Sequence, residues 1–173
     1  MKKSWWYLIV LALVFLSFFL DGKVTDFVIN HRNSELIGFF EFFTNLGEWY
    51  FLFIVIGIFI FFKIDKRWVV YSWFSLGITL LVVFLLKISF IRERPFGVGP
   101  SYSFPSGHAS AAFSLVPLFI SKFKNYKFLI ILIAVLIAFS RIYLGYHYLS
   151  DVLAGGLIGY VVGGIISKNE SGN

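Results

Sequence analysis

The chain has 173 residues, of which 59% are hydrophobic and 21% aromatic, whereas only 14% are charged. Soluble domains carry about 25% charged residues, so this composition excludes an ordinary soluble domain and indicates an integral membrane protein. The chain contains no cysteine, which excludes disulfides, thiolate catalysis and cysteine metal ligands.

Six apolar stretches approach the length that is needed to cross about 30 Å of hydrocarbon. In chain order they are residues 5–20, 49–62, 68–90, 106–121, 126–142 and 150–166. We therefore predict an all-α fold, an integral membrane bundle of six transmembrane helices with both termini on one side. Because no internal repeat or low-complexity linker interrupts the chain, residues 1–173 are predicted to form a single membrane-embedded domain.

The longest link between these stretches, residues 21–48, has a pattern of its own. Four apolar side chains recur in it at the spacing of one helix face: Leu36, Phe39, Phe40 and Phe43. A potential N-cap precedes them at Asn33 or Ser34. The pattern predicts a short interfacial helix, within residues 33–45, on the outer side of the membrane. A helix that packs against the bundle and has no functional role explains the spacing equally well.

Glycines recur every fourth residue in the last apolar stretch, at Gly155, Gly159 and Gly163. Small residues at this spacing let two helix backbones approach closely. We expect the contact to lie within one chain, and a dimer contact is the alternative.

The basic residues predict the orientation of the bundle. The links on the side of the termini hold most of the lysines and arginines, among them Lys66, Arg67, Lys122 and Lys124. Cytoplasmic loops carry such an excess, so the termini are predicted to be cytoplasmic and the other links to face the outer side of the membrane. This bias also accounts for the net charge of +6 without a nucleic-acid partner.

Three clusters of polar residues fall on the predicted outer side. They are Lys87 with Arg94; Ser106, Gly107 and His108; and Ser140, Arg141, His147 and Asp151. Ionisable groups at membrane depth are costly and mark functional cavities, so convergence of these clusters predicts a site. Isolated charges near a membrane more often reach headgroups or solvent, which is our interpretation of Lys23, His31 and Arg32. We likewise interpret Arg92 and Glu93 as solvated or locally paired.

The residue types of these clusters suit an anion. Lys87, Arg94 and Arg141 supply positive charge and several donors, which match the oxygens of phosphate or carboxylate groups. Ser106 is a good helix N-cap, and Gly107 lets a ligand approach the backbone at the start of a helix, where anions bind. The sequence therefore predicts a phosphate-binding site at the start of the fourth stretch.

The third cluster also predicts a nucleophile. His147 and Asp151 are four residues apart, so on a helix or its first turn they share one face. A carboxylate so placed fixes the tautomer of the imidazole and raises the basicity of its other nitrogen, which makes His147 the candidate nucleophile. His108 is the candidate general acid. No acidic cluster with metal spacing accompanies them, so we expect no metal and no cofactor, with the protein's own cations stabilising the transition state.

Three segments resemble the motifs of the type 2 phosphatidic acid phosphatase (PAP2) family. They are "KISFIRERP" at 87–95, "PSGH" at 105–108 and "SRIYLGYHYLSD" at 140–151. Their order and spacing match the family throughout the C-terminal half of the chain. Soluble acid phosphatases and vanadium-dependent haloperoxidases share these motifs, but the six apolar stretches argue against both.

The resemblance implies a metal-independent phosphatase. In such an enzyme Lys87, Arg94 and Arg141 bind the phosphoryl oxygens, helped by Ser106, Gly107 and Ser140. The resemblance also implies that His147, oriented by Asp151, attacks phosphorus to give a phosphohistidine, and that His108 protonates the leaving group.

Small bacterial members of the family hydrolyse lipid phosphates of the cell envelope, so the resemblance implies such a substrate. It also implies a bacterial inner membrane as the location, with the site on its periplasmic face. Candidates are lipid A 1-phosphate, undecaprenyl pyrophosphate, phosphatidylglycerol phosphate and phosphatidic acid, and a lipid A 1-phosphatase is one specific expectation. The expected partners are this lipid phosphate and the surrounding membrane lipids. The alternative is a membrane transporter or binding protein for anions or lipid phosphates, which would use the same cations but would not need the histidines.

Overall fold

A computed structural model describes residues 4–62, 64–97 and 101–171 of the chain. The predicted domain of 1–173 also includes residues 1–3, 63, 98–100 and 172–173, which lie outside the described residues. The helices are α1 (Ser4–His31), α2 (Ile37–Leu46), α3 (Trp49–Ile58), α4 (Lys66–Phe90), α5 (Gly107–Lys122), α6 (Lys127–Tyr143) and α7 (Leu149–Ser171). Short 3-10 turns are η1 (Ser34–Leu36), η2 (Pro95–Gly97) and η3 (Lys124–Tyr126). The described ranges contain no strand, which confirms the all-α prediction.

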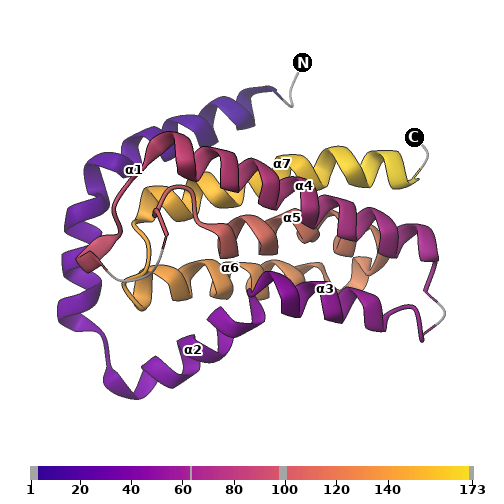
Figure 1. Cartoon of the computed structure of the whole chain (residues 1–173), viewed down its shortest axis with the longest axis horizontal. Coiled ribbons are helices and arrows are strands. Elements are labelled where there is room, and N and C mark those ends of the chain that lie inside the picture. Colours follow the sequence, from indigo (N-terminus) through magenta and orange to yellow (C-terminus); the bar gives the residue numbers. More distant parts are fainter. Residues whose placement is uncertain (1–3, 63, 98–100, 172–173) are drawn as a thin grey trace.

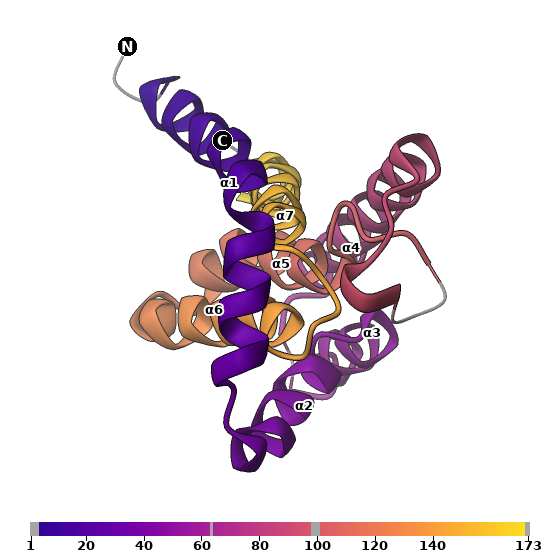
Figure 2. The ribbon, with the colours of Figure 1, turned by 90° about the vertical axis from the view of Figure 1, so that its left-hand side faces the viewer.

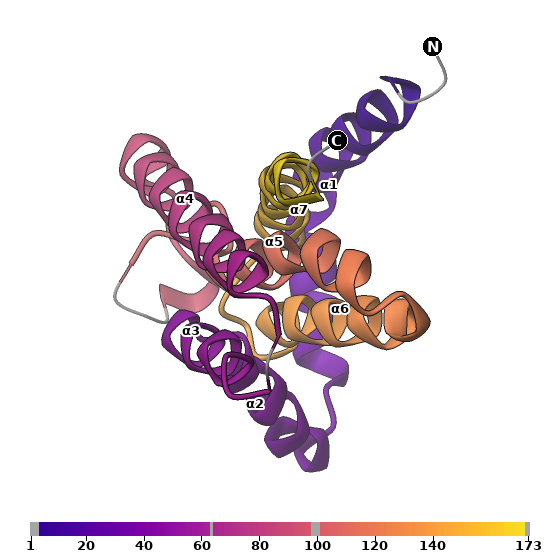
Figure 3. The same cartoon turned by 90° about the vertical axis from the view of Figure 1, so that its right-hand side faces the viewer.

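The helices form a bundle with α5 near its centre. Helices α4, α6 and α7 surround α5, and α3 lies beside α4 (Figures 1 and 3). Helices α4 and α6 end, and α5 and α7 begin, at the same end of the bundle. The second half of α1 crosses this end before the chain turns into α2 (Figures 1 and 2). All three predicted polar clusters therefore lie at one end of the bundle, beneath α1.

Four segments are long and apolar enough to cross a membrane by themselves. They are Leu8–His31, Lys66–Phe90, Lys124–Tyr143 and Leu149–Glu170. The pair Ser34–Leu46 and Trp49–Ile58, bent by 63°, gives a fifth candidate if it is counted as one span. The described residues thus hold four to five candidate spans, compared with the six predicted, because α5 has only 16 residues and α3 only 10. Each of the six predicted apolar stretches nevertheless overlaps a helix.

The predicted end of the first stretch at residue 20 is wrong, because α1 continues to His31. The apolar run stops at Leu20, and Asp21 follows it. The Asp21 side chain is instead buried and ion-paired with Arg92, so its charge does not end the helix.

The predicted helix within residues 33–45 is confirmed as η1 and α2. Asn33 is the N-cap, and its side chain accepts a hydrogen bond from the Glu35 amide at 2.9 Å. Phe40 of α2 is buried against α6, and its ring centroid lies 4.2 Å from that of Tyr143 on α6. The packing against the bundle is therefore established for one face of α2, while its position in the membrane interface stays a prediction.

The glycine repeat lies directly against α5. A Cβ atom built on Gly155 would lie 2.5 Å from the carbonyl oxygen of Ser106. A Cβ atom on Gly159 or Gly163 would lie 2.1 Å from the carbonyl oxygen of Ser110 or Ser114, respectively. No side chain fits at these distances, so the predicted close contact within one chain is confirmed. The contact fixes the start of α7 beside the start of α5.

Candidate active site

The predicted cations and histidines converge on His147, which is 1% exposed and lies in the loop between α6 and α7. Burial lowers the pKa of His147 well below its usual value, and the positive charges of Arg141, Arg94, Lys87 and His108 lower it further. These charges act on one imidazole because the structure brings groups from four separate segments to it. The lowered pKa favours the neutral imidazole, which is the state that a nucleophile requires.

Asp151 lies next to His147, as predicted, but by a different local structure. His147 precedes the first residue of α7, so the pair does not share a helix face. The His147 Nδ1 atom lies 3.5 Å from Asp151 Oδ2 and has no hydrogen-bond partner among the described residues. Asp151 Oδ2 also accepts a hydrogen bond from the Tyr148 amide at 2.9 Å, which caps the start of α7.

A tight turn after α6 brings His147 back toward Arg141. Gly145 has a φ of +78°, in the left-handed region that glycine favours at helix ends. The amides of Tyr146 and His147 then both donate to the carbonyl oxygen of Arg141, at 3.0 and 3.1 Å. The Arg141 guanidinium lies 4.4 Å from the Tyr146 ring centroid, and its Nη1 donates to Thr44 Oγ1 on α2 at 2.5 Å. Its Nε atom is buried without a partner among the described residues, so a donor is available for a polar ligand.

The predicted N-cap of α5 is confirmed at Ser106, whose side chain accepts from the Ala109 amide. The Ser106 amide donates to the Asp151 carbonyl oxygen at 2.9 Å. This bond joins the first turns of α5 and α7, so the helix start at Gly107 lies close to the His147 loop. Partial positive charge at a helix start favours an anion there.

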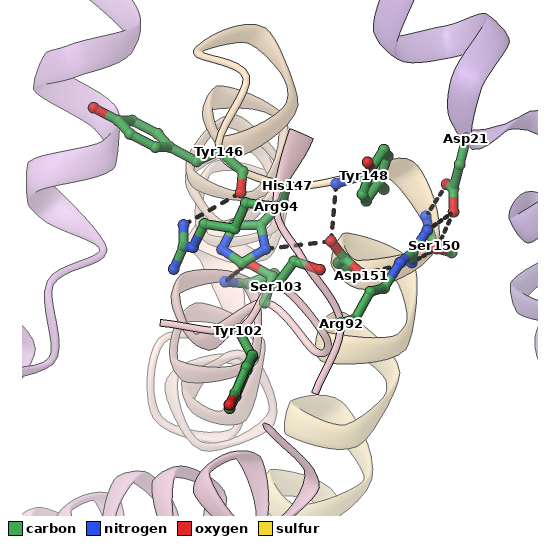
Figure 4. A network of polar contacts seen from close by, with 12 residues as sticks. Asp21, Arg92, Arg94, Tyr102, Ser103, Tyr146, His147, Tyr148, Ser150 and Asp151 are labelled. Atoms are coloured by element: carbon green, nitrogen blue, oxygen red, sulfur yellow. Dashed lines mark hydrogen bonds and ion pairs between the residues drawn. The ribbon is translucent and has the colours of Figure 1, made fainter. Parts of the chain in front are cut away.

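Lys87 and Arg94 are both held by backbone carbonyls. The Lys87 Nζ atom donates to the carbonyl oxygens of Tyr102 and Ser103. The Arg94 guanidinium donates to the Ser101 carbonyl oxygen at 2.7 Å and to that of Tyr146 at 3.2 Å, next to His147 (Figure 4). These hydrogen bonds orient two long flexible side chains, so the positions of their charged groups are fixed.

His108 has a carboxylate partner that the sequence analysis missed. Its Nε2 atom lies 3.2 Å from Oε1 of Glu48, in the link between α2 and α3. The neighbouring Gly47 makes this approach possible, because a Cβ atom there would lie 2.4 Å from Ile137 and 3.1 Å from His108. The available sequence signal for this contact was Gly47 followed by Glu48, directly before an apolar run.

The interpretation of Arg92 as solvated or locally paired is wrong. Its guanidinium lies 2.7 Å from Asp21 on α1 and 2.8 Å from Asp151 on α7, and only 25% of the side chain is exposed (Figure 4). Both partners are distant in sequence, so no local pattern could indicate them. Glu93, by contrast, is exposed.

Two other assignments have different outcomes. The Ser140 hydroxyl donates to the Ile137 carbonyl oxygen in its own helix at 2.7 Å, so its help in phosphate binding stays a prediction. Lys23, His31 and Arg32 are exposed, as expected for charges outside the site. Within the described ranges, no three or more histidine, aspartate and glutamate side chains gather in a group that could hold a metal ion.

Comparisons with known proteins agree with the motifs. Residues 68–171, more than half of the chain, match the PAP2 superfamily. An undecaprenyl-diphosphatase from Sulfolobus acidocaldarius is 26% identical, covering 92% of this chain and 88% of that protein. A lipid A 4'-phosphatase from Porphyromonas gingivalis is 30% identical, covering 79% of this chain and 67% of that protein.

A solved structure also resembles the whole bundle. The transmembrane PAP2-type phosphatidylglycerolphosphate phosphatase from Bacillus subtilis has a TM-score of 0.81 and 26% sequence identity, over 96% of this chain and 94% of that one. The likeness and the candidate spans together show a multi-pass membrane protein. The chain therefore belongs to the PAP2 superfamily, which is the family that its three motifs indicated.

Proposed function

We propose that this protein is a membrane lipid phosphatase that hydrolyses a phosphate monoester or pyrophosphate of an envelope lipid. The observation that supports this most directly is the buried His147, with Asp151 on one side and with three cations and a second histidine that act on it. An anion carrier needs the cations but has no use for a buried nucleophile with an orienting carboxylate. The similar proteins named above are phosphatases of lipids, which agrees with this proposal.

In the proposed mechanism, His147 attacks the phosphorus atom through Nε2, because Nδ1 faces Asp151. The P–O bond to the leaving group breaks, its electron pair goes to the leaving oxygen, and His108 donates a proton to that oxygen. Water then attacks the phosphohistidine and releases inorganic phosphate, with His108 accepting the proton. Both steps pass through transition states whose negative charge lies on the phosphoryl oxygens.

The protein's cations stabilise this charge in the proposal. The charges of Lys87, Arg94 and Arg141 act on His147, which supports their role as the cations that bind a phosphoryl group bonded to it. Ser106, Gly107 and Ser140 complete the predicted phosphate-binding set. Donors that are fixed before the reaction stabilise developing charge without reorganisation, which suits a metal-independent reaction.

We infer six membrane crossings, formed by α1, the bent pair of α2 and α3, α4, α5, α6 and α7, with the termini in the cytoplasm and the site on the periplasmic face. The support is the concentration of Lys and Arg on the side of the termini. The short α5 is enclosed by other helices rather than by lipid, so its length need not match the bilayer (Figure 3).

A cavity whose lining reaches the Gly47 turn supports a lipid as the substrate. It has a volume of about 240 Å³ and lies between α3, α5 and α6, lined by apolar side chains. Two of its lining residues, Leu46 and Ile137, adjoin Gly47, where the chain passes His108. A hydrocarbon chain in this cavity would place its phosphorylated end at the histidines. Lipid A 1-phosphate, undecaprenyl pyrophosphate, phosphatidylglycerol phosphate and phosphatidic acid all fit this description.

The direct test is release of inorganic phosphate by purified protein in detergent, with EDTA present, from each of these four lipids. We expect metal-free release from at least one lipid, and the rates rank the substrates. A water-soluble ester, p-nitrophenyl phosphate, is the control for a requirement for the lipid chain. No release from any lipid would contradict the proposal and favour a transporter or binding protein.

The exposed aromatic face of α2 is expected to guide long lipid chains toward the site. Phe39 and Phe42 are 47% and 59% exposed, whereas Phe40 is buried. Changing both exposed residues to Ala should lower kcat/KM for a long-chain lipid phosphate by about three- to tenfold, since about 1 kcal/mol of apolar contact is lost. Activity on p-nitrophenyl phosphate should change little. Equal losses on both substrates would contradict a role in lipid access, and Phe128→Ala, at an exposed position on α6, is the matched control.

A further inference from the structure

Asp151 is part of a network of charged and polar groups that extends to α1, outside the three motifs (Figure 4). We propose that Arg92 and Asp21 are positioning residues that hold the Asp151 carboxylate against His147. The inference rests on the proposed function, because it assigns to this pair an effect on the reactivity of His147.

Both oxygens of Asp151 are held by partners. Oδ1 accepts a hydrogen bond from Arg92 Nη1 at 2.8 Å, and Oδ2 accepts one from the Tyr148 amide at 2.9 Å. The same Oδ2 lies 3.5 Å from His147 Nδ1, beyond the usual length of an N–H···O bond. A shift of the Asp151 carboxylate by a few tenths of an ångström therefore decides whether Oδ2 accepts a hydrogen bond from the imidazole of His147. We expect Arg92 to set this position, because its guanidinium donates a hydrogen bond to Oδ1, the other oxygen of Asp151.

Asp21 fixes Arg92 and the first turn of α7 at the same time. Its Oδ2 atom accepts from Arg92 Nη2 at 2.7 Å, and its Oδ1 atom accepts from the Ser150 amide at 2.9 Å. The Ser150 hydroxyl also donates to Asp21 and accepts from Arg92 Nη1. Asp21 is only 4% exposed, so these bonds are shielded from water. Through them α1 holds the residue directly before Asp151.

The guanidinium has little freedom to move. It lies 4.2 Å from the Tyr148 ring centroid and 5.2 Å from that of Phe18, so its plane is fixed between aromatic rings. One guanidinium bonded to two buried carboxylates uses the planar geometry of arginine, which an ammonium group cannot reproduce. Arg92 therefore joins α1 to the dyad of His147 and Asp151.

The test compares Arg92→Gln, Arg92→Lys and Asp21→Asn with wild type, using the best lipid substrate in detergent. We expect Arg92→Gln to lower kcat by about 10- to 100-fold, as is typical when an outer partner of an orienting group is lost, while KM changes less than about threefold. Arg92→Lys should retain part of the activity. Glu93→Gln, which changes an exposed charge in the same loop, should match wild type.

A double-mutant cycle separates positioning from general destabilisation. In an Asp151→Asn background, Arg92→Gln should lower kcat by less than about twofold more, because the group through which Arg92 acts is already lost. Multiplicative losses, or a loss confined to KM, would overturn the role of Arg92. If Arg92→Gln does not give folded protein, Arg92→Lys and Asp21→Asn carry the same cycle. Inactive wild-type protein would contradict the proposed function itself, so the two failures are distinguishable.

Discussion

Replacing His147 with Ala is expected to lower phosphate release from the lipid substrate by about 10⁴- to 10⁶-fold, the scale of losing a nucleophile that acts within a unit. The reason is that the phosphohistidine cannot form, and water alone must attack the bound phosphoryl group. KM should change much less, because the cations that bind phosphate remain. Phosphate release in detergent under substrate saturation measures the effect.

A second variant distinguishes loss of the nucleophile from loss of folding. His147→Asn keeps a buried polar side chain but offers no nucleophile, so it should be as inactive as the alanine variant. Both variants should elute as wild type in size-exclusion chromatography in detergent. Activity that survives either substitution would remove His147 from the nucleophile role, while the membership of the family would stand.

The pH dependence of the wild type provides an independent check on the same residue. The imidazole faces Arg141, Arg94, Lys87 and the carboxylate of Asp151, and burial and the cations lower its pKa. A lowered pKa means that the reactive neutral form persists as the pH falls below about 6.5, the ordinary value for histidine. The acid limb of kcat/KM, which reports the free enzyme, should therefore lie below pH 6.5. A limb at or above that value would contradict the neutral, buried nucleophile.

The motifs were sufficient to predict which residues the structure brings together, because these residues lie at helix ends with fixed local spacing. Ser106 is a favourable N-cap, and α5 begins directly after it at Gly107. The start of α7, at Leu149, lies between His147 and Asp151. The glycine repeat likewise predicted the close contact that joins these two helices. Each of these features depends on neighbours within a few residues, which a single sequence displays.

The partners from the N-terminal part of the chain could not be predicted in the same way. Asp21, Thr44 and Glu48 contact Arg92, Arg141 and His108 respectively, across separations of at least 60 residues. Such pairs arise from the path of α1 and α2 around the end of the bundle, which has no local signature. The N-terminal third of the chain thus supplies partners to the candidate site residues, although it lies outside the matched family region, which begins at residue 68.

The role of His108 leads to a prediction that depends on the leaving group. His108→Ala should lower turnover of a lipid phosphate by about 10²- to 10⁴-fold, the usual contribution of a general acid. The first step with p-nitrophenyl phosphate should slow less than tenfold, because nitrophenolate leaves without a proton. A pre-steady-state burst of nitrophenolate measures this step alone, before water attacks the phosphohistidine.

The second step separates the acid role of His108 from its base role. In the His108→Ala variant, a preserved burst followed by slow steady turnover is expected, because His108 also accepts the proton of the attacking water. Equal slowing of the burst for both leaving groups would show that His108 binds phosphate instead of donating a proton. His31→Ala is the control, since His31 is exposed on α1 with its Nδ1 bonded to the Phe27 carbonyl oxygen. The two histidines therefore differ in a measurable way: loss of His147 abolishes both steps, whereas loss of His108 spares the first step when the leaving group needs no proton.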